Sequence, residues 1–129
     1  MNAVEIEEAV SLLAEQEFDP AGFPFAFLEA FGNKKTTIDK LKKKGKGSSN
    51  ASDIEGGVLQ RNHIHMAVCA EGEVSNTLAA LKASPATNTV RNKVKFVLAT
   101  DGVTLEAEDL TSDVPPIACV YKEFPDHFG

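Results

Sequence analysis

The chain has only 2 cysteines, no tryptophan and no long apolar run. Cys69 and Cys119 lie far apart, each in an apolar stretch, which favours free buried thiols in a reducing compartment over a disulfide framework. No apolar run is long enough to span a bilayer, and the acidic start MNAVEIEEAV is unlike a signal or transit peptide. We therefore expect a cytoplasmic protein with no membrane partner.

Several motifs of catalysis are also missing. No serine lies in a strand-to-helix elbow, no glycine-rich loop lies between a strand and a helix, and no CxxC pair is present. These absences argue against a serine nucleophile, a phosphate-binding loop and a zinc site of the CxxC type. The aromatic residues mostly fall on core faces, so stacking on nucleic-acid bases is not expected.

What is present is the composition of one globular domain, with 129 residues of which 43% are hydrophobic and 25% charged. The net charge is −6, yet seven of the thirteen Lys and Arg residues fall within residues 34–46. Such a cluster can contact a phosphate backbone, or it can be the solvated C-terminal end of a helix, where Lys is favoured. The residues considered for DNA contact are Lys40, Lys42, Lys43, Lys44 and Lys46.

The first third of the chain has helical periodicity. Asn2 and Glu5 have the spacing of a capping box at the start of a first helix. Asp19–Pro20 predicts the start of a second helix, which continues through FPFAFLEAFG and ends at Gly32. A third short helix is predicted over residues 36–45.

The remaining two thirds predict strands around one helix. VLQRNHIHMAVC (residues 58–69) predicts a single strand with Ile64 and Met66 on one face and His63 and His65 on the other. Helical spacing returns in EGEVSNTLAALKAS, and KVKFVLATDG, VTLEAEDL and PPIACVYKEF predict three more strands. Asp101–Gly102 predicts a hairpin. The order predicts an α+β fold, with N-terminal helices followed by a mixed sheet and a packed crossover helix.

One stretch, SDIEGGVLQRNHIH, contains the candidate site. Asp53 begins a predicted hairpin, and His63 and His65 are two residues apart on the predicted strand. Because residues two apart in a strand point to the same side, we expect Asp53, His63 and His65 to lie close together at the edge of the sheet.

The chain resembles the N-terminal domain of the MmeI-like type IIL restriction–modification enzymes, which join a nuclease domain to a DNA adenine methyltransferase. The resemblance extends over essentially the whole chain and rests on FLEAFG, GGVL, KFVLATDG with VTLEAEDL, and EFPDHFG. In that family the domain has a PD-(D/E)xK nuclease fold, with Asp, nine residues, and then Glu-x-Lys. Here Asp53 and the spacing match, but His63 and His65 stand at the Glu and Lys positions.

The two histidines change the expected chemistry. Mg²⁺ prefers carboxylate oxygens, whereas neutral imidazoles suit Zn²⁺, Ni²⁺ or Fe²⁺. The site is therefore an inactive nuclease remnant, an altered transition-metal site, or a set of ordinary polar strand positions. We expect the first, with no catalytic residue, no bound metal and no cleavage of DNA with Mg²⁺. The motif predicts that His63→Glu and His65→Lys are both needed to restore a nuclease.

The resemblance also implies a longer protein. Residues 1–129 are then a single nuclease-like N-terminal domain that docks on a C-terminal methyltransferase region of the same chain. S-adenosylmethionine is expected in that region and no cofactor in this one, and DNA is a partner of the full-length protein. Two alternatives stay open: an active metal-dependent endonuclease that uses Asp53, His63 and His65, and a stand-alone protein-interaction domain.

Overall fold

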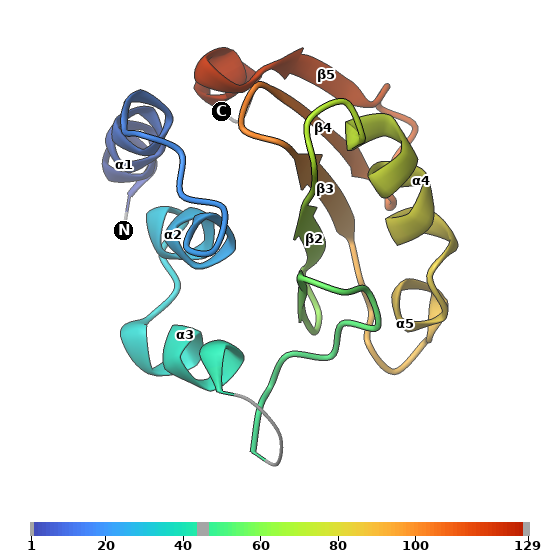
Figure 1. The fold of residues 1–129 in the computed structure, drawn as a ribbon. Helices are drawn as coiled ribbons and strands as arrows, with labels where there is room; N and C mark the ends of the chain where they lie inside the picture. The colour runs from blue at the N-terminus through green and yellow to red at the C-terminus, as the bar shows by residue number, and fades with distance from the viewer. Residues whose placement is uncertain (1, 44–46, 128–129) are drawn as a thin grey trace.

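The computed structural model describes residues 2–43 and 47–127. The elements in this part of the chain are α1 (Ala3–Glu15), α2 (Phe23–Ala30), α3 (Lys35–Lys42), β1 (Gly57–Gln60), β2 (Ile64–Val68), α4 (Val74–Ala83), α5 (Pro85–Asn88), β3 (Phe96–Thr100), β4 (Thr104–Asp109), β5 (Ile117–Val120) and the 3₁₀ helix η1 (Tyr121–His127). Helices α1 to α3 lie on one side of a mixed sheet, and α4 and α5 lie on the other (Figure 1). The predicted α+β fold is confirmed.

Helix α1 begins as its sequence predicts. The Asn2 side chain accepts the Glu5 N–H at 2.9 Å, and its amide group is 3.4 Å from the Glu5 carboxylate. The first bond satisfies one of the backbone donors that the first turn of a helix otherwise leaves free, and the second joins the two side chains. Val10 and Ala14 are the buried residues of the helix, so its inner face is narrow.

Helix α2 begins later than predicted and ends where predicted. Asp19 accepts the Ala21 N–H at 3.2 Å and so stabilises a turn, while the helix itself begins at Phe23. The prediction that Asp19–Pro20 opens the helix is therefore wrong. At the other end Gly32 has φ 98°, and the Asn33 N–H donates to the Leu28 carbonyl at 3.1 Å. Only glycine adopts this left-handed C-cap without a Cβ penalty.

The predicted strand over residues 58–69 is in fact a hairpin. Strands β1 and β2 pair antiparallel, with Val58 opposite Met66 and Gln60 opposite Ile64. The chain reverses between them at Asn62, whose φ is 66°. Asn tolerates this left-handed conformation better than most residues, and alternation of side chains on both sides of the turn conceals it in the sequence.

Within the described residues the sheet has five strands in the order β1-β2-β3-β4-β5. Only β2 and β3 pair in parallel, and the chain crosses from one to the other through α4 and α5. The Asp101–Gly102 hairpin between β3 and β4 is confirmed, with Gly102 at φ 87°. Strand β5 lies at the edge and pairs with β4, as the prolines before it predict.

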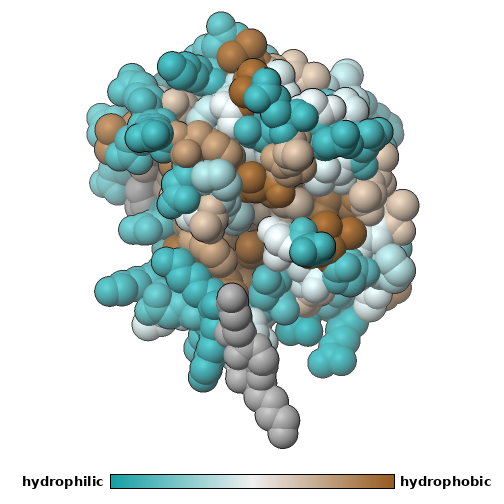
Figure 2. Space-filling view, in the orientation of Figure 1, coloured by the Kyte–Doolittle hydropathy of each residue, from teal (hydrophilic) through white to brown (hydrophobic). Residues whose placement is uncertain are grey.

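The two faces of the sheet bury different cores. Ile64 and Met66 pack toward α1, α2 and η1 in the larger core. On the other face Val74, Leu78 and Leu81 of α4 pack on Ala67, Val97 and Ala99, which confirms that this helix covers the sheet. Figure 2 shows hydrophilic residues over much of the face seen in Figure 1, with hydrophobic residues reaching the surface near its middle.

The cysteines belong to opposite cores. Cys69 packs with the α4 side and Cys119 with the α1–α2 side, and both are free thiols that are only partly buried. The prediction of free thiols is confirmed. Among the described residues, no helix combines the length and the apolar character that crossing a membrane requires.

Candidate functional site

Asp53 lies in the loop before β1 and contacts the start of α5. Its carboxylate accepts hydrogen bonds from the Ser84 hydroxyl and, at 3.1 Å, from the Ala86 N–H. The bond from Ser84 is the largest cause that lowers the pKa of Asp53 below its usual value. Ser84 also caps α5 by accepting the Thr87 N–H at 3.4 Å. These hydrogen bonds therefore connect the loop that contains Asp53 to the start of α5.

His65 is fully buried, with an exposed fraction of 0%. Its Nε2 is 2.7 Å from the Ser52 hydroxyl, and its Nδ1 is 2.8 Å from the Thr87 hydroxyl. Burial lowers the pKa of His65, and the charge of Asp53 offsets part of that shift. A series of hydrogen bonds thus joins Asp53, Ser84, Thr87, His65 and Ser52, and both nitrogens of the imidazole are hydrogen-bonded.

His63 lies toward the N-terminal helices, in the turn between β1 and β2. Its Nδ1 is 2.8 Å from the Gln60 side-chain oxygen, and the Gln60 amide donates to Asn33 at 2.8 Å. The ring also meets Phe96 edge to face, with 6.1 Å between ring centroids. Burial, followed by the charge of Lys95, lowers the pKa of His63. His63 and His65 therefore have no partner in common.

The structure brings Asp53 and His65 together but separates His63 from them. The prediction that all three converge is wrong, because the rule for residues two apart applies only within one strand. Strand β2 begins at Ile64, so His63 is part of the turn and points away from His65.

These residues do not fit the Mg²⁺ site that the nuclease motif implies. Asp53 is the single carboxylate, and both of its oxygens accept hydrogen bonds from α5. Both nitrogens of His65 are likewise engaged by hydroxyl groups. Over residues 2–43 and 47–127, no group of three or more His, Cys, Asp and Glu side chains is placed to hold a metal ion. The network is a structural connection between the loop, β2 and α5.

The sequence did not point to the hydroxyl partners of this network. Ser52, Ser84 and Thr87 are common residue types, and Ser84 lies 31 positions from Asp53. The one local indication is Ser84–Pro85, which has the pattern of an N-cap followed by proline at the first helical position. In the structure Ser84 is both the C-cap of α4 and the N-cap of α5.

The lysine cluster lies on α3 and just after it. Lys40, Lys42 and Lys43 are exposed, and the Lys42 ammonium lies 5.4 Å from the centroid of the Phe25 ring. Lys44 and Lys46, also considered for DNA contact, lie outside the described residues.

Acid is expected to destabilise the domain through His65. Below pH 6.5, the usual pKa of histidine, the unfolded chain binds a proton at this position while the folded domain does not. Stability is therefore fully present above that pH and is lost as the pH falls toward the lowered folded pKa. The unfolding midpoint in urea should decrease from about pH 8 to about pH 5.5.

The variant His65→Gln keeps hydrogen-bonding groups and cannot titrate, so its midpoint should change less over the same range. The pKa of His63 is lowered as well, so His63→Gln is the matched variant that measures the contribution from the other side of the sheet. If the urea midpoint of His65→Gln decreased in acid as much as that of the unchanged chain, His65 would not be the source of the pH dependence.

Comparison with protein families identifies the class of protein as the N-terminal domain of a restriction–modification enzyme. The matching family model is described as MmeI, N-terminal domain, and it covers residues 1–129. The chain belongs to this family. Neither a curated protein nor a solved structure was found to match it.

Proposed function

We propose that this chain is a non-catalytic, nuclease-like module at the N-terminus of a DNA adenine methyltransferase of restriction–modification or phage-defence type. The observation that supports this proposal is the hydrogen-bond network at Asp53. The motif carboxylate is occupied by Ser84 and Ala86, and His63, at the Glu position, lies away from it. A Mg²⁺-dependent nuclease needs carboxylate ligands that face one metal ion, and this arrangement lacks them.

In this proposal the domain docks on the methyltransferase region of the same protein, and S-adenosylmethionine binds there. Its own contribution to DNA binding is a sequence-independent contact between the lysines of α3 and the phosphate backbone. Membership of a family of restriction–modification enzymes supports the proposal that this domain is part of a larger protein. The exposure of Lys40, Lys42 and Lys43 supports the contact.

A nicking assay on supercoiled plasmid tests the absence of catalysis. The purified domain with Mg²⁺ should leave the plasmid intact, as should the variant Asp53→Asn. Nicking by the unchanged domain that Asp53→Asn abolishes would overturn the proposal, because it would show that this carboxylate still binds a catalytic metal.

The lysines are expected to give weak, salt-sensitive binding to duplex DNA, with Kd on the order of 10⁻⁴–10⁻⁶ M. The triple change Lys40→Gln, Lys42→Gln and Lys43→Gln should weaken binding and flatten its dependence on salt, since each phosphate contact releases a counterion. The matched control is the same change at Lys82, Lys93 and Lys122, which lie outside α3. Equal losses in the two triple variants would show that the contact is not on α3.

A further inference from the structure

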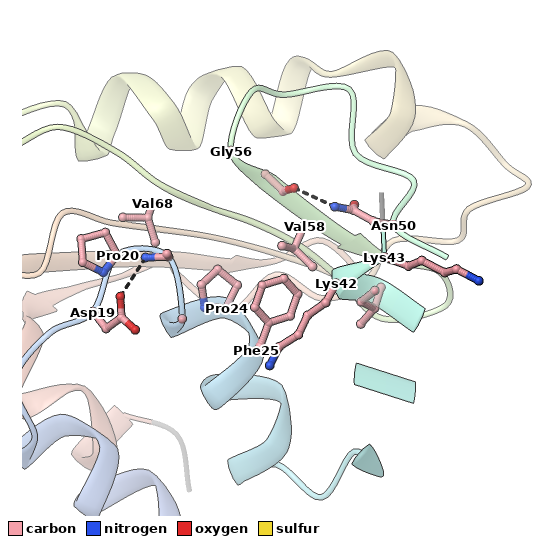
Figure 3. A pocket seen from close by; sticks show the side chains of 14 residues that line it. Asp19, Pro20, Pro24, Phe25, Lys42, Lys43, Asn50, Gly56, Val58 and Val68 are labelled. Carbon is pink, nitrogen blue, oxygen red and sulfur yellow. Dashed lines mark hydrogen bonds between the residues drawn. The ribbon is translucent and has the colours of Figure 1, made fainter. Parts of the chain in front are cut away.

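A pocket of about 780 Å³ opens between the turn before α2, the end of α3 and the loop that leads into β1. Figure 3 shows Asp19 and Pro20 at one end of this pocket and the start of the Lys42 and Lys43 side chains at the other, with Lys42 turned toward Phe25 and Lys43 extending away from it. Pro24 and Phe25 lie between the two ends, with Val58 and Val68 across from them. The pocket therefore has an apolar middle, one acidic end and one basic end.

Phe25 differs from its neighbours in α2. Phe23, Phe27 and Leu28 are buried, whereas Phe25 is only partly buried and lines the pocket. The Lys42 ammonium lies 5.4 Å from its ring centroid, within the distance at which a cation and an aromatic ring attract. The ammonium therefore covers the face of the ring that a bound ligand could take over.

We infer that this pocket binds one nucleotide of single-stranded DNA, with the base taking the place of the Lys42 ammonium on the Phe25 ring and the phosphate drawing Lys42 and Lys43 to it. Every base has a π face that can stack on an aromatic side chain, and lysines beside such a platform bind the backbone. The carboxylate of Asp19 repels a phosphate from the opposite end, so the nucleotide has one orientation. The inference rests on the proposed contact of α3 with DNA and adds to it a preference for unpaired bases. It departs from the expectation that no aromatic residue stacks on bases, because Phe25 is only partly buried.

Two further features of the pocket fit this occupant. Gly56 lines the pocket, and no atom lies within 4 Å of the position that a Cβ would take there, so no side chain of its own or of a neighbour blocks access to this stretch of backbone. Lys42 is the last residue of α3 and Lys43 is its C-cap, so the lysine surface proposed to contact duplex phosphates continues into the pocket. An unpaired base next to a bound duplex can therefore enter the pocket while the duplex stays bound to α3.

Fluorescence anisotropy on labelled DNA at low salt tests the inference. The probes are a single strand of about twelve nucleotides, a duplex of the same length, and a single strand in which the central residues are abasic. Phe25→Leu should weaken binding of the single strand about five- to tenfold, the low end of the value of one base–aromatic stack, and should leave duplex binding nearly unchanged. Phe25→Tyr keeps the ring and should bind like the unchanged chain.

The lysine variants separate this inference from the proposed function. Lys42→Gln with Lys43→Gln should weaken both probes, and the matched pair Lys34→Gln with Lys35→Gln, at the start of α3, should weaken the single strand less. If the first pair weakens duplex binding but Phe25→Leu does not alter single-strand binding, the pocket inference is wrong and the proposed function stands. If neither variant alters binding of any probe, both fail.

The abasic strand keeps the test decisive even if Phe25→Leu does not fold, because it uses the unchanged protein. It should bind about as weakly as the intact strand binds Phe25→Leu. Equal affinity of the abasic and intact strands would overturn the inference, since no base would then occupy the pocket.

Discussion

Replacing Phe124 by alanine is expected to lower the free energy of unfolding by about 3–5 kcal/mol, the usual loss for a buried phenylalanine. Its exposed fraction is 0%, and its ring lies 5.3 Å from that of Tyr121, 6.2 Å from Phe27 and 6.4 Å from Phe23. Phe124 belongs to η1, so the 3₁₀ helix that follows β5 completes the core beneath α1 and α2. A loss of this size is a large part of the stability of a domain of this length.

Equilibrium unfolding in urea measures the loss, and Phe96→Ala is the matched control. Phe96 is the same residue type at the start of β3, but it is 37% exposed, so its truncation leaves a smaller cavity. A loss for Phe124→Ala no greater than that for Phe96→Ala would show that η1 is not part of the cooperative unit.

The features that the sequence predicted correctly are those set by residues close together in the chain. Asn2 and Glu5 are three apart, and the cap they form is a local exchange of hydrogen bonds. Gly32 ends α2 because the left-handed conformation is required at one position. The apolar face of α4 follows from helical spacing alone. None of these depends on which distant segment lies nearby.

The features that the sequence did not predict depend on contacts at long range or on a conformation that several residue types allow. Nothing in QRNH requires a turn, and the alternation of VLQRNHIHMAVC fits one strand as well as two. The bond between Asp53 and Ser84 joins positions 31 apart, and no local rule pairs them. The candidate site depends on both the unpredicted turn and the long-range bond to Ser84. Its spacing therefore matches the family motif although its geometry does not.

The double change His63→Glu with His65→Lys is expected to destabilise the domain by about 3 kcal/mol or more and to give no cleavage of DNA with Mg²⁺. From the sequence alone this variant was the one needed to restore a nuclease. The structure alters that expectation, because position 63 is in the turn and faces Gln60 rather than Asp53. A glutamate there cannot join Asp53 around one metal ion without a rearrangement of the hairpin.

The loss of stability comes from position 65. A lysine there places an ammonium where the exposed fraction is 0%, between the hydroxyls of Ser52 and Thr87 that now bond the neutral imidazole. Burying a charge is strongly unfavourable unless a partner compensates it, and the carboxylate of Asp53 already accepts two hydrogen bonds from α5. The single variant His65→Lys should therefore account for most of the loss, and His63→Glu for little of it.

Urea unfolding of the two single variants and the double variant, with a plasmid-nicking assay on each, decides between the two expectations. His65→Gln is the control for position 65, since it changes the side chain without adding a charge and should lose less stability than His65→Lys. Mg²⁺-dependent nicking by the double variant that Asp53→Asn abolishes would show that the hairpin can bring position 63 to Asp53. The separation of the two histidines would then depend on the side chains present and not on the fold. Metal binding would in that case provide the free energy needed to move the turn.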